Sequence, residues 1–99
     1  MTDQPSTSEP VEVSLVGEFD LSNVAQLRER LDAALQSDGN PIVLDMAGLT
    51  FLDSAGIGEL IRAQNHLTPG RTIVLRGARP QIEKLLQLTG LSAVFGIQT

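Results

Sequence analysis

Apolar and polar side chains alternate along residues 11–15 (Val-Glu-Val-Ser-Leu), and Gly17 ends this run. A period of two residues predicts a β-strand with one buried face. The preceding residues 1–10 include two prolines and, after Met1, no large apolar side chain, so they are predicted to form a flexible tail. The folded domain is therefore expected to span residues 11–99.

Three further segments predict strands. Residues 42–44 (Ile-Val-Leu) are wholly apolar, which is typical of a strand buried on both faces of a sheet. Residues 72–75 are mostly β-branched, and residues 93–97 are expected to supply a last short strand.

Apolar residues recur at helical spacing between these strands. The first helix is predicted from Val24 to Leu35, with Ser22 or Asn23 as its cap. Asn23 and Gln26 have the spacing of a capping box.

A second helix is expected to begin at Asp53 or Ser54, and a third to run from Pro80 to a stop at Gly90. The predicted inward stripe of the second helix consists of Ile57, Leu60, Ile61 and Leu67. Its polar face, with Glu59, Arg62 and His66, is expected to be solvated. Alternation of strands and helices predicts a single α/β domain, with a mostly parallel or mixed four-stranded sheet covered by about three helices.

Composition excludes several classes of function. The 99 residues carry 12 acidic and 7 basic side chains, a formal charge of −5, which argues against a general nucleic-acid binder. Cysteine is absent and there is one histidine, so disulfides, thiolate catalysis and a zinc site are not expected, and no cofactor is predicted. No apolar run approaches the ~20 residues of a membrane span, and the first ten residues lack the pattern of a signal peptide. A cytoplasmic protein without membrane insertion is expected.

The segment that begins the second helix, Asp53-Ser54-Ala55-Gly56-Ile57-Gly58, contains two glycines. Each costs a helix ~1 kcal/mol relative to alanine. Gly56 is therefore expected either to pack closely within the fold or to leave the backbone open to a partner.

Three roles are considered for Ser54. As a nucleophile it would need a base, but His66 lies ~18 Å further along the same helix. Leu52 also occupies the position of the first glycine of a Gly-x-Ser-x-Gly elbow, so no enzymatic activity is expected. A helix cap and a phosphoacceptor both remain open. A helix start tolerates a phosphate, yet roughly two negative charges beside Asp53 would repel or block a partner.

Residues 16–20 (Val-Gly-Glu-Phe-Asp), the strand at 42–45 and residues 51–58 (Phe-Leu-Asp-Ser-Ala-Gly-Ile-Gly) resemble the signature of the STAS family. These are the sulphate-transporter and anti-sigma-factor-antagonist domains. Residues 79–91 are similar to the family's later helix and its trailing Thr-Gly-Leu. The resemblance covers residues 11–97.

The resemblance implies a bacterial anti-sigma factor antagonist. It would bind a serine-kinase anti-sigma factor and free a sigma factor for transcription. That kinase would end the interaction by phosphorylating Ser54, and a phosphoserine phosphatase would reset it. Asp20 matches an acidic family position near the acceptor, with helix capping as its other reading. The expected partner-binding residues are Asp20, Asp53, Ser54, Ala55, Gly56, Gly58, Glu59 and Arg62.

The chain departs from the family pattern at both ends. The family usually has an extra strand before Val11 and often a helix beyond Thr99, and both are expected to be missing or shortened here. An exposed sheet edge would invite a homodimer or partner pairing. Two alternatives stay open: a STAS-like subunit of a membrane lipid-transport ATP-binding-cassette assembly, which often carries Thr in place of Ser54, and a nucleotide-binding STAS module. Nucleotide binding has little support, since no phosphate-binding Gly-rich loop precedes Lys84, the one lysine.

Overall fold

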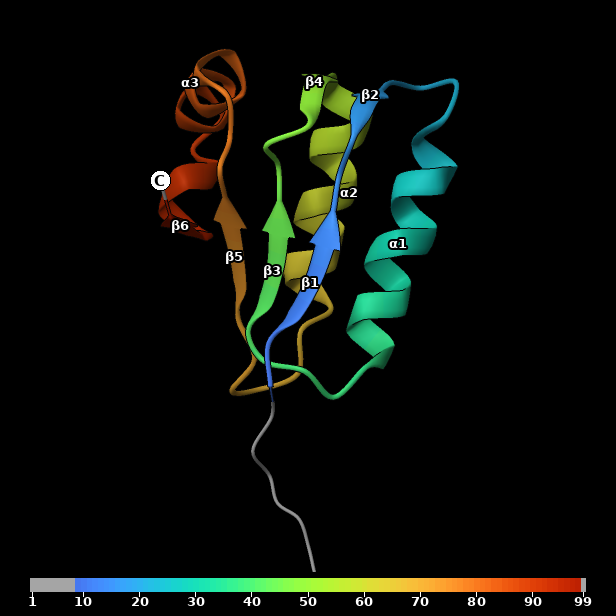
Figure 1. Cartoon of the computed structure of the whole chain (residues 1–99), viewed down its shortest axis with the longest axis vertical. Coiled ribbons are helices and arrows are strands. Elements are labelled where there is room, and N and C mark those ends of the chain that lie inside the picture. Colours follow the sequence, from blue (N-terminus) through green and yellow to red (C-terminus); the bar gives the residue numbers. More distant parts are fainter. Residues whose placement is uncertain (1–8, 99) are drawn as a thin grey trace, which may run out of the picture.

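The computed structural model describes residues 9–98 and shows within them three α-helices and six strands (Figure 1). In chain order the elements are β1 (Val11–Ser14), β2 (Gly17–Phe19), α1 (Val24–Gln36), β3 (Ile42–Asp45), β4 (Leu49–Leu52), α2 (Ser54–Asn65), β5 (Ile73–Arg76), α3 (Pro80–Leu88), the short 3-10 helix η1 (Leu91–Ala93) and β6 (Gly96–Gln98).

Four of the strands form one parallel sheet in the order β1-β3-β5-β6. Val13, Leu44 and Leu75 are aligned across its first three strands. Strands β2 and β4 form a second, two-stranded parallel sheet in which Phe19 pairs with Leu52. Figure 1 shows these short strands beyond the C-terminal ends of β1 and β3, next to the start of α2. Strand β4 of the second sheet therefore ends directly before the first turn of α2.

The hydrophobic core lies between the four-stranded sheet and helices α1 and α2, which pack against each other; in Figure 1 α2 lies behind the sheet and α1 lies to its right. Burying each large aliphatic side chain contributes about 1.5–3 kcal/mol relative to leaving it exposed. The fully buried members include Leu15, Leu27, Leu31, Leu44, Leu60 and Leu75.

These features confirm the predicted α/β class, the four-stranded parallel sheet and the three helices. Residues 42–44 are buried as the apolar run predicted. The apolar stripe of α1 faces the core through Leu27, Leu31 and Ala34. Helix α3 begins at Pro80 and is followed by Gly90, whose φ of 79° is the left-handed conformation that favours glycine.

Strands β2 and β4 were not predicted. Gly17 was expected to end a strand, but it begins β2, and its N–H donates to the Gly48 carbonyl oxygen at 2.8 Å. No strand was predicted at residues 49–52, yet they form β4. Strand β2 has only three residues, and β4 does not alternate, because Leu49 and Leu52 are buried while Thr50 and Phe51 are exposed, so neither displays a period of two.

Two local predictions were wrong. The last strand begins at Gly96 instead of residue 93, because Leu91–Ala93 forms a 3-10 turn. Asn23 occupies the cap position of α1, but its side chain makes no capping bond there. Its Oδ1 instead accepts from the Asp20 N–H and its Nδ2 donates to the Glu18 carbonyl oxygen, both at 2.8 Å. Asn23 therefore braces the preceding loop, and the capping box does not form.

The predicted tail and the extra family strand before Val11 fall on residues 1–10, of which residues 1–8 lie outside the described residues. The expectation about a C-terminal helix stays a prediction. Across the described part of the chain, no helix has the length and apolar character needed to cross a membrane.

Candidate functional site

Ser54 is exposed at the first position of α2, and the neighbouring Asp53 is the helix cap. Asp53 Oδ1 accepts hydrogen bonds from the backbone N–H groups of Ala55 at 2.9 Å and Gly56 at 3.2 Å. Because the capping oxygen comes from Asp53, the helix does not need the Ser54 hydroxyl as its cap. The structure thus separates two roles that the sequence left open: Asp53 holds the helix start, and the Ser54 side chain is accessible beside it.

Asp20 lies in the loop between β2 and α1, which adjoins the start of α2. Its Oδ1 accepts from the Ser22 hydroxyl at 2.5 Å and from the Ser22 N–H at 2.8 Å. These hydrogen bonds, the hydroxyl's above all, hold the pKa of the Asp20 carboxyl below its ordinary value. The loop is tied to α2 because the Leu21 N–H donates to Asp53 Oδ2 at 3.2 Å. The structure therefore brings the segments of both predicted acidic residues together, with Asp20 bracing its own loop.

The two glycines of α2 have different surroundings. Gly56 is buried, and a Cβ placed on it would lie 2.3 Å from Leu52 Cδ1, so any larger residue would force the Leu52 side chain to shift. Gly58 is exposed, and a Cβ on it would meet nothing within 4 Å. The packing interpretation therefore holds for Gly56, whereas Gly58 presents open backbone to the surface.

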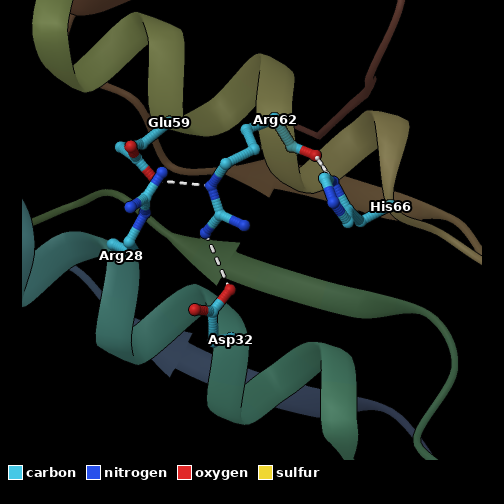
Figure 2. A network of polar contacts seen from close by, with 5 residues as sticks. All are labelled: Arg28, Asp32, Glu59, Arg62 and His66. Atoms are coloured by element: carbon cyan, nitrogen blue, oxygen red, sulfur yellow. Dashed lines mark hydrogen bonds and ion pairs between the residues drawn. The ribbon is translucent and has the colours of Figure 1, made fainter.

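Glu59 and Arg62 join α2 to α1, as Figure 2 shows. Arg62 Nη2 lies 2.7 Å from Asp32 Oδ1, and Arg62 Nε lies 2.8 Å from Glu59 Oε1. Arg28 Nε donates to the same Glu59 oxygen at 3.2 Å. The hydrogen bond with Asp32, followed by that with Glu59, raises the pKa of Arg62 above its ordinary value. His66 Nδ1 lies 2.8 Å from the Arg62 carbonyl oxygen, which requires its proton on Nδ1.

The predicted solvated face is therefore partly wrong. The side chains of Glu59 and Arg62 are only 15% and 22% exposed, because they are held against α1. The sequence missed this network because Arg28 and Asp32 are supplied by another helix. A partner contact by Glu59 or Arg62 stays a prediction.

Ile61 was predicted to face the core but is 41% exposed. The buried side of α2 consists of Gly56, Ile57, Leu60 and Ala63. Because Gly56 and Ala63 are small, this side of α2 packs closely against the rest of the fold. Ile61 lies about 100° around the helix from Leu60 and so points away from that side. A helical wheel that counted Gly56 and Ala63 as inward positions would have found this exposure.

The outer edge of β1 carries a surface hollow of about 380 Å³. It is lined by residues 11–14 together with Arg30, Ala33 and Ala34. The Arg30 guanidinium donates to the Ser14 carbonyl oxygen and so covers part of this strand edge. Within residues 9–98 there is no cluster of three or more His, Asp or Glu side chains that could hold a metal ion.

Comparisons with known proteins find a matching family, related sequences and similar structures. A family model described as "Mlab, STAS domain" matches residues 2–97. The anti-sigma F factor antagonist of Lysinibacillus sphaericus is 36% identical over 88 residues, which are 86% of this chain and 74% of that protein. An anti-sigma factor antagonist from Mycobacterium paratuberculosis has a similar structure, with a TM-score of 0.79 and 25% identity over 95% of this chain and 80% of that one.

A further similar structure is the Bacillus cell fate determinant SpoIIAA in its phosphorylated form. Its TM-score is 0.66 at 29% identity, covering 97% of this chain and 88% of that one. The family match over nearly the whole chain, supported by these relatives, shows that this chain belongs to the STAS domain family.

Proposed function

We propose that this chain is an anti-sigma factor antagonist that binds a serine-kinase anti-sigma factor and thereby releases a sigma factor. In this proposal, phosphorylation of Ser54 ends the binding, and a phosphoserine phosphatase restores it. The observation that carries the proposal is the exposed Ser54 at the first position of α2, beside a helix cap supplied by Asp53.

The geometry supports a switch that acts at the surface. Because Asp53 already binds the N–H groups of Ala55 and Gly56, a phosphate on Ser54 replaces no bond that holds the helix. The positive end of the α2 dipole also favours an anion there. The modification would add about −1.5 to −2 charges next to Asp53, enough to repel a closely fitted partner.

Relatives support the same reading. The Lysinibacillus sphaericus relative is named an anti-sigma F factor antagonist, and SpoIIAA has been solved in a phosphorylated form. In this chain the residue after Ser54 is alanine, so the helix start offers one hydroxyl. The proposed role is regulatory binding in the cytoplasm, with no enzymatic activity of the chain itself.

The proposed partner surface surrounds Ser54. It includes the segments that pack near the helix start and the first turns of α2: Asp20, Asp53, Ala55, Gly56, Gly58, Glu59 and Arg62. The carboxylates of Asp20 and Asp53 are engaged within the protein, so we expect them to position backbone groups toward the partner. Gly56 is buried and acts by allowing the helix to pack.

Phosphopeptide mass spectrometry tests the proposal directly. The purified chain is incubated with ATP and each anti-sigma factor kinase encoded by the source genome, and phosphate is expected on Ser54 alone. Ser54→Ala is the control and is expected to accept none. Modification elsewhere, or by none of the kinases, would contradict the proposal.

Titrations with the same kinase test the switch. Ser54→Asp is expected to abolish binding while Ser54→Ala preserves it, and both variants are expected to melt near the wild-type temperature. Equal affinity for both variants would refute regulation by charge at Ser54. Binding of all variants to the ATP-binding subunit of a transport assembly would favour the alternative within the family.

A further inference from the structure

Strand β1 is an outer strand of the four-stranded sheet, and among the described residues only β3 pairs with it. Figure 1 shows it at the side of the sheet next to α1. The Val11 N–H points toward β3, where it donates to the Pro41 carbonyl oxygen at 3.0 Å. Because the backbone groups of a strand alternate between its two sides, Glu12 and Ser14 direct their N–H and C=O groups away from β3. These groups form the β1 edge.

Arg30 covers one group of the β1 edge. Its guanidinium reaches over from α1 and donates to the Ser14 carbonyl oxygen. Arg30 is exposed, and within residues 9–98 no carboxylate pairs with it. A charged side chain over a free strand edge hinders pairing with another strand. Because the contact is open to solvent, the guanidinium can exchange it for water and release the edge.

The surface hollow of about 380 Å³ lies directly beside the β1 edge. Its walls are residues 11–14 of β1 and Arg30, Ala33 and Ala34 of α1. Val13 is half-buried and packs against the core, so its side chain lies on the α1 side of the sheet. The small side chains of the two alanines leave room for a further apolar side chain there. The occupant that fits is therefore an extended strand with an apolar residue opposite Val13.

We propose that a second copy of this chain occupies the β1 edge, with the two β1 strands paired antiparallel about a two-fold axis. Glu12 of each copy then lies opposite Ser14 of the other, and the two Val13 residues face each other. This register pairs the outward N–H and C=O groups of both copies. It also brings each Val13 side chain to the hollow of the other copy. The proposal is independent of the switch at Ser54.

The edge complements itself, which favours a second copy as the occupant. One strand supplies the outward backbone groups, the valine and the hollow, and an isologous interface uses each of them twice. A register with Glu12 opposite Glu12 would place like charges face to face, which destabilises strand pairing. A strand of four residues buries little surface, so the dimer belongs to the weak, transient class. Arg30 weakens it further, because it must first leave the Ser14 carbonyl oxygen.

Sedimentation equilibrium of the full chain, from about 10 µM to about 1 mM, tests the association. Arg30→Ala is expected to tighten the dimer about tenfold, because the edge no longer has a competing donor. Arg28→Ala is the matched control. It removes the same charge from the same helix, but its contact is with Glu59 on α2, so wild-type association is expected.

Ser14→Pro in the Arg30→Ala background tests the strand edge itself. Proline removes an outward N–H and no bond to β3, so the dimer is expected to be lost while the melting temperature stays near that of Arg30→Ala. Ser14→Ala keeps the N–H and is expected to associate as the Arg30→Ala chain does.

Cysteine cross-linking tests the register, since the natural chain has no cysteine. In the Arg30→Ala background, Val13→Cys is expected to form a disulfide-linked dimer in a glutathione redox buffer. The two residues at position 13 form a non-hydrogen-bonded antiparallel pair, whose Cα atoms lie about 4.5 Å apart. Ser14→Cys is the control and is expected to stay unlinked, because diagonal positions lie more than about 7 Å apart.

Each contrary result overturns the proposal. A monomeric Arg30→Ala chain at about 1 mM would leave the β1 edge to an extended segment of another protein. Equal tightening by Arg28→Ala would assign the effect to net charge. Association that survives Ser14→Pro would place the contact elsewhere, and a cross-link through position 14 instead of 13 would exclude the proposed pairing. No kinase enters these measurements, so their outcome does not depend on the proposed function.

Discussion

Asp53 Oδ2 accepts a hydrogen bond from the backbone N–H of Leu21 at 3.2 Å, which joins two segments 32 residues apart in sequence. The other oxygen of the same carboxylate caps α2. One side chain therefore fixes both the start of α2 and the loop that precedes α1. Leu21 is 79% exposed, so the loop that is bonded to Asp53 presents an apolar side chain to solvent.

Replacing Asp53 is expected to destabilise the protein through loss of the cap. Asp53→Ala should lower the free energy of unfolding by about 1–2 kcal/mol, because the Ala55 and Gly56 N–H groups lose their acceptor. Asp53→Asn keeps an oxygen at this position and should cost less. Urea unfolding measures both, with Ser54→Ala as a control expected to change stability by less than about 0.5 kcal/mol. An equal loss in Ser54→Ala would mean that Ser54 is the true cap.

The two glycines of α2 are expected to respond in opposite directions to alanine. Gly56→Ala should destabilise the protein by about 1–3 kcal/mol, because the new Cβ would overlap Leu52 and force the core to shift. Gly58→Ala should stabilise it by up to about 1 kcal/mol. Thermal melts of the two variants provide the comparison, since 1 kcal/mol shifts the melting temperature of a domain this size by about 4–8 °C. Shifts of the same sign would contradict the assigned surroundings.

The local pattern of apolar residues predicted the elements that display one. Helix α1 repeats its apolar stripe over 13 residues, and residues 42–44 are an unbroken apolar run, so both were predicted from the sequence. Strands β2 and β4 show neither a period of two in their burial nor an unbroken apolar run, and what defines them is their pairing with each other. No window of a few residues contains that information.

The candidate site was likewise predicted only where neighbouring residues carry the signal. The Asp53-Ser54 step was found in the sequence because a strand, a polar pair and a helix follow one another directly. The bond from Leu21 to Asp53 joins residues 32 positions apart and that from Arg62 to Asp32 joins residues 30 apart, and neither has a local signature. Ile61 was placed inward because its own apolar character was counted, while the small buried residues that displace it were not.

The ion pair between Arg62 and Asp32 is expected to couple α2 to α1. Its partners are 22% and 41% exposed, so a double-mutant cycle of Arg62→Met and Asp32→Ala should give a coupling energy of about 0.5–1 kcal/mol. The coupling should fall as salt screens the pair. Arg28→Met is the control, since Arg28 is 54% exposed and makes a longer contact, and it should cost less than Arg62→Met. A coupling near zero at low salt would show that this ion pair does not help to hold the two helices together.

The contact between Glu12 and Arg76 predicts how the free energy of unfolding depends on pH. Arg76 reaches from β5 to β1, where its Nη2 lies 2.9 Å from Glu12 Oε1, and it also approaches Asp45 at 3.5 Å. The hydrogen bond from Arg76 lowers the pKa of Glu12 below its ordinary value of 4.5. The unfolded chain therefore binds a proton at Glu12 more readily than the folded chain. Stability from this pair is present above pH 4.5 and is lost as the pH falls below that value.

Glu12→Gln should consequently make the urea midpoint less sensitive to acid between about pH 7 and pH 3 than it is in the wild-type protein. Asp20, whose pKa is lowered by Ser22, adds a loss of the same sign, but it is present in both proteins and cancels in the difference. Glu29→Gln removes the same charge from an exposed position on α1 and serves as the control. If Glu29→Gln flattens the acid dependence as much as Glu12→Gln does, the effect comes from net charge, and the contact with Arg76 does not explain it.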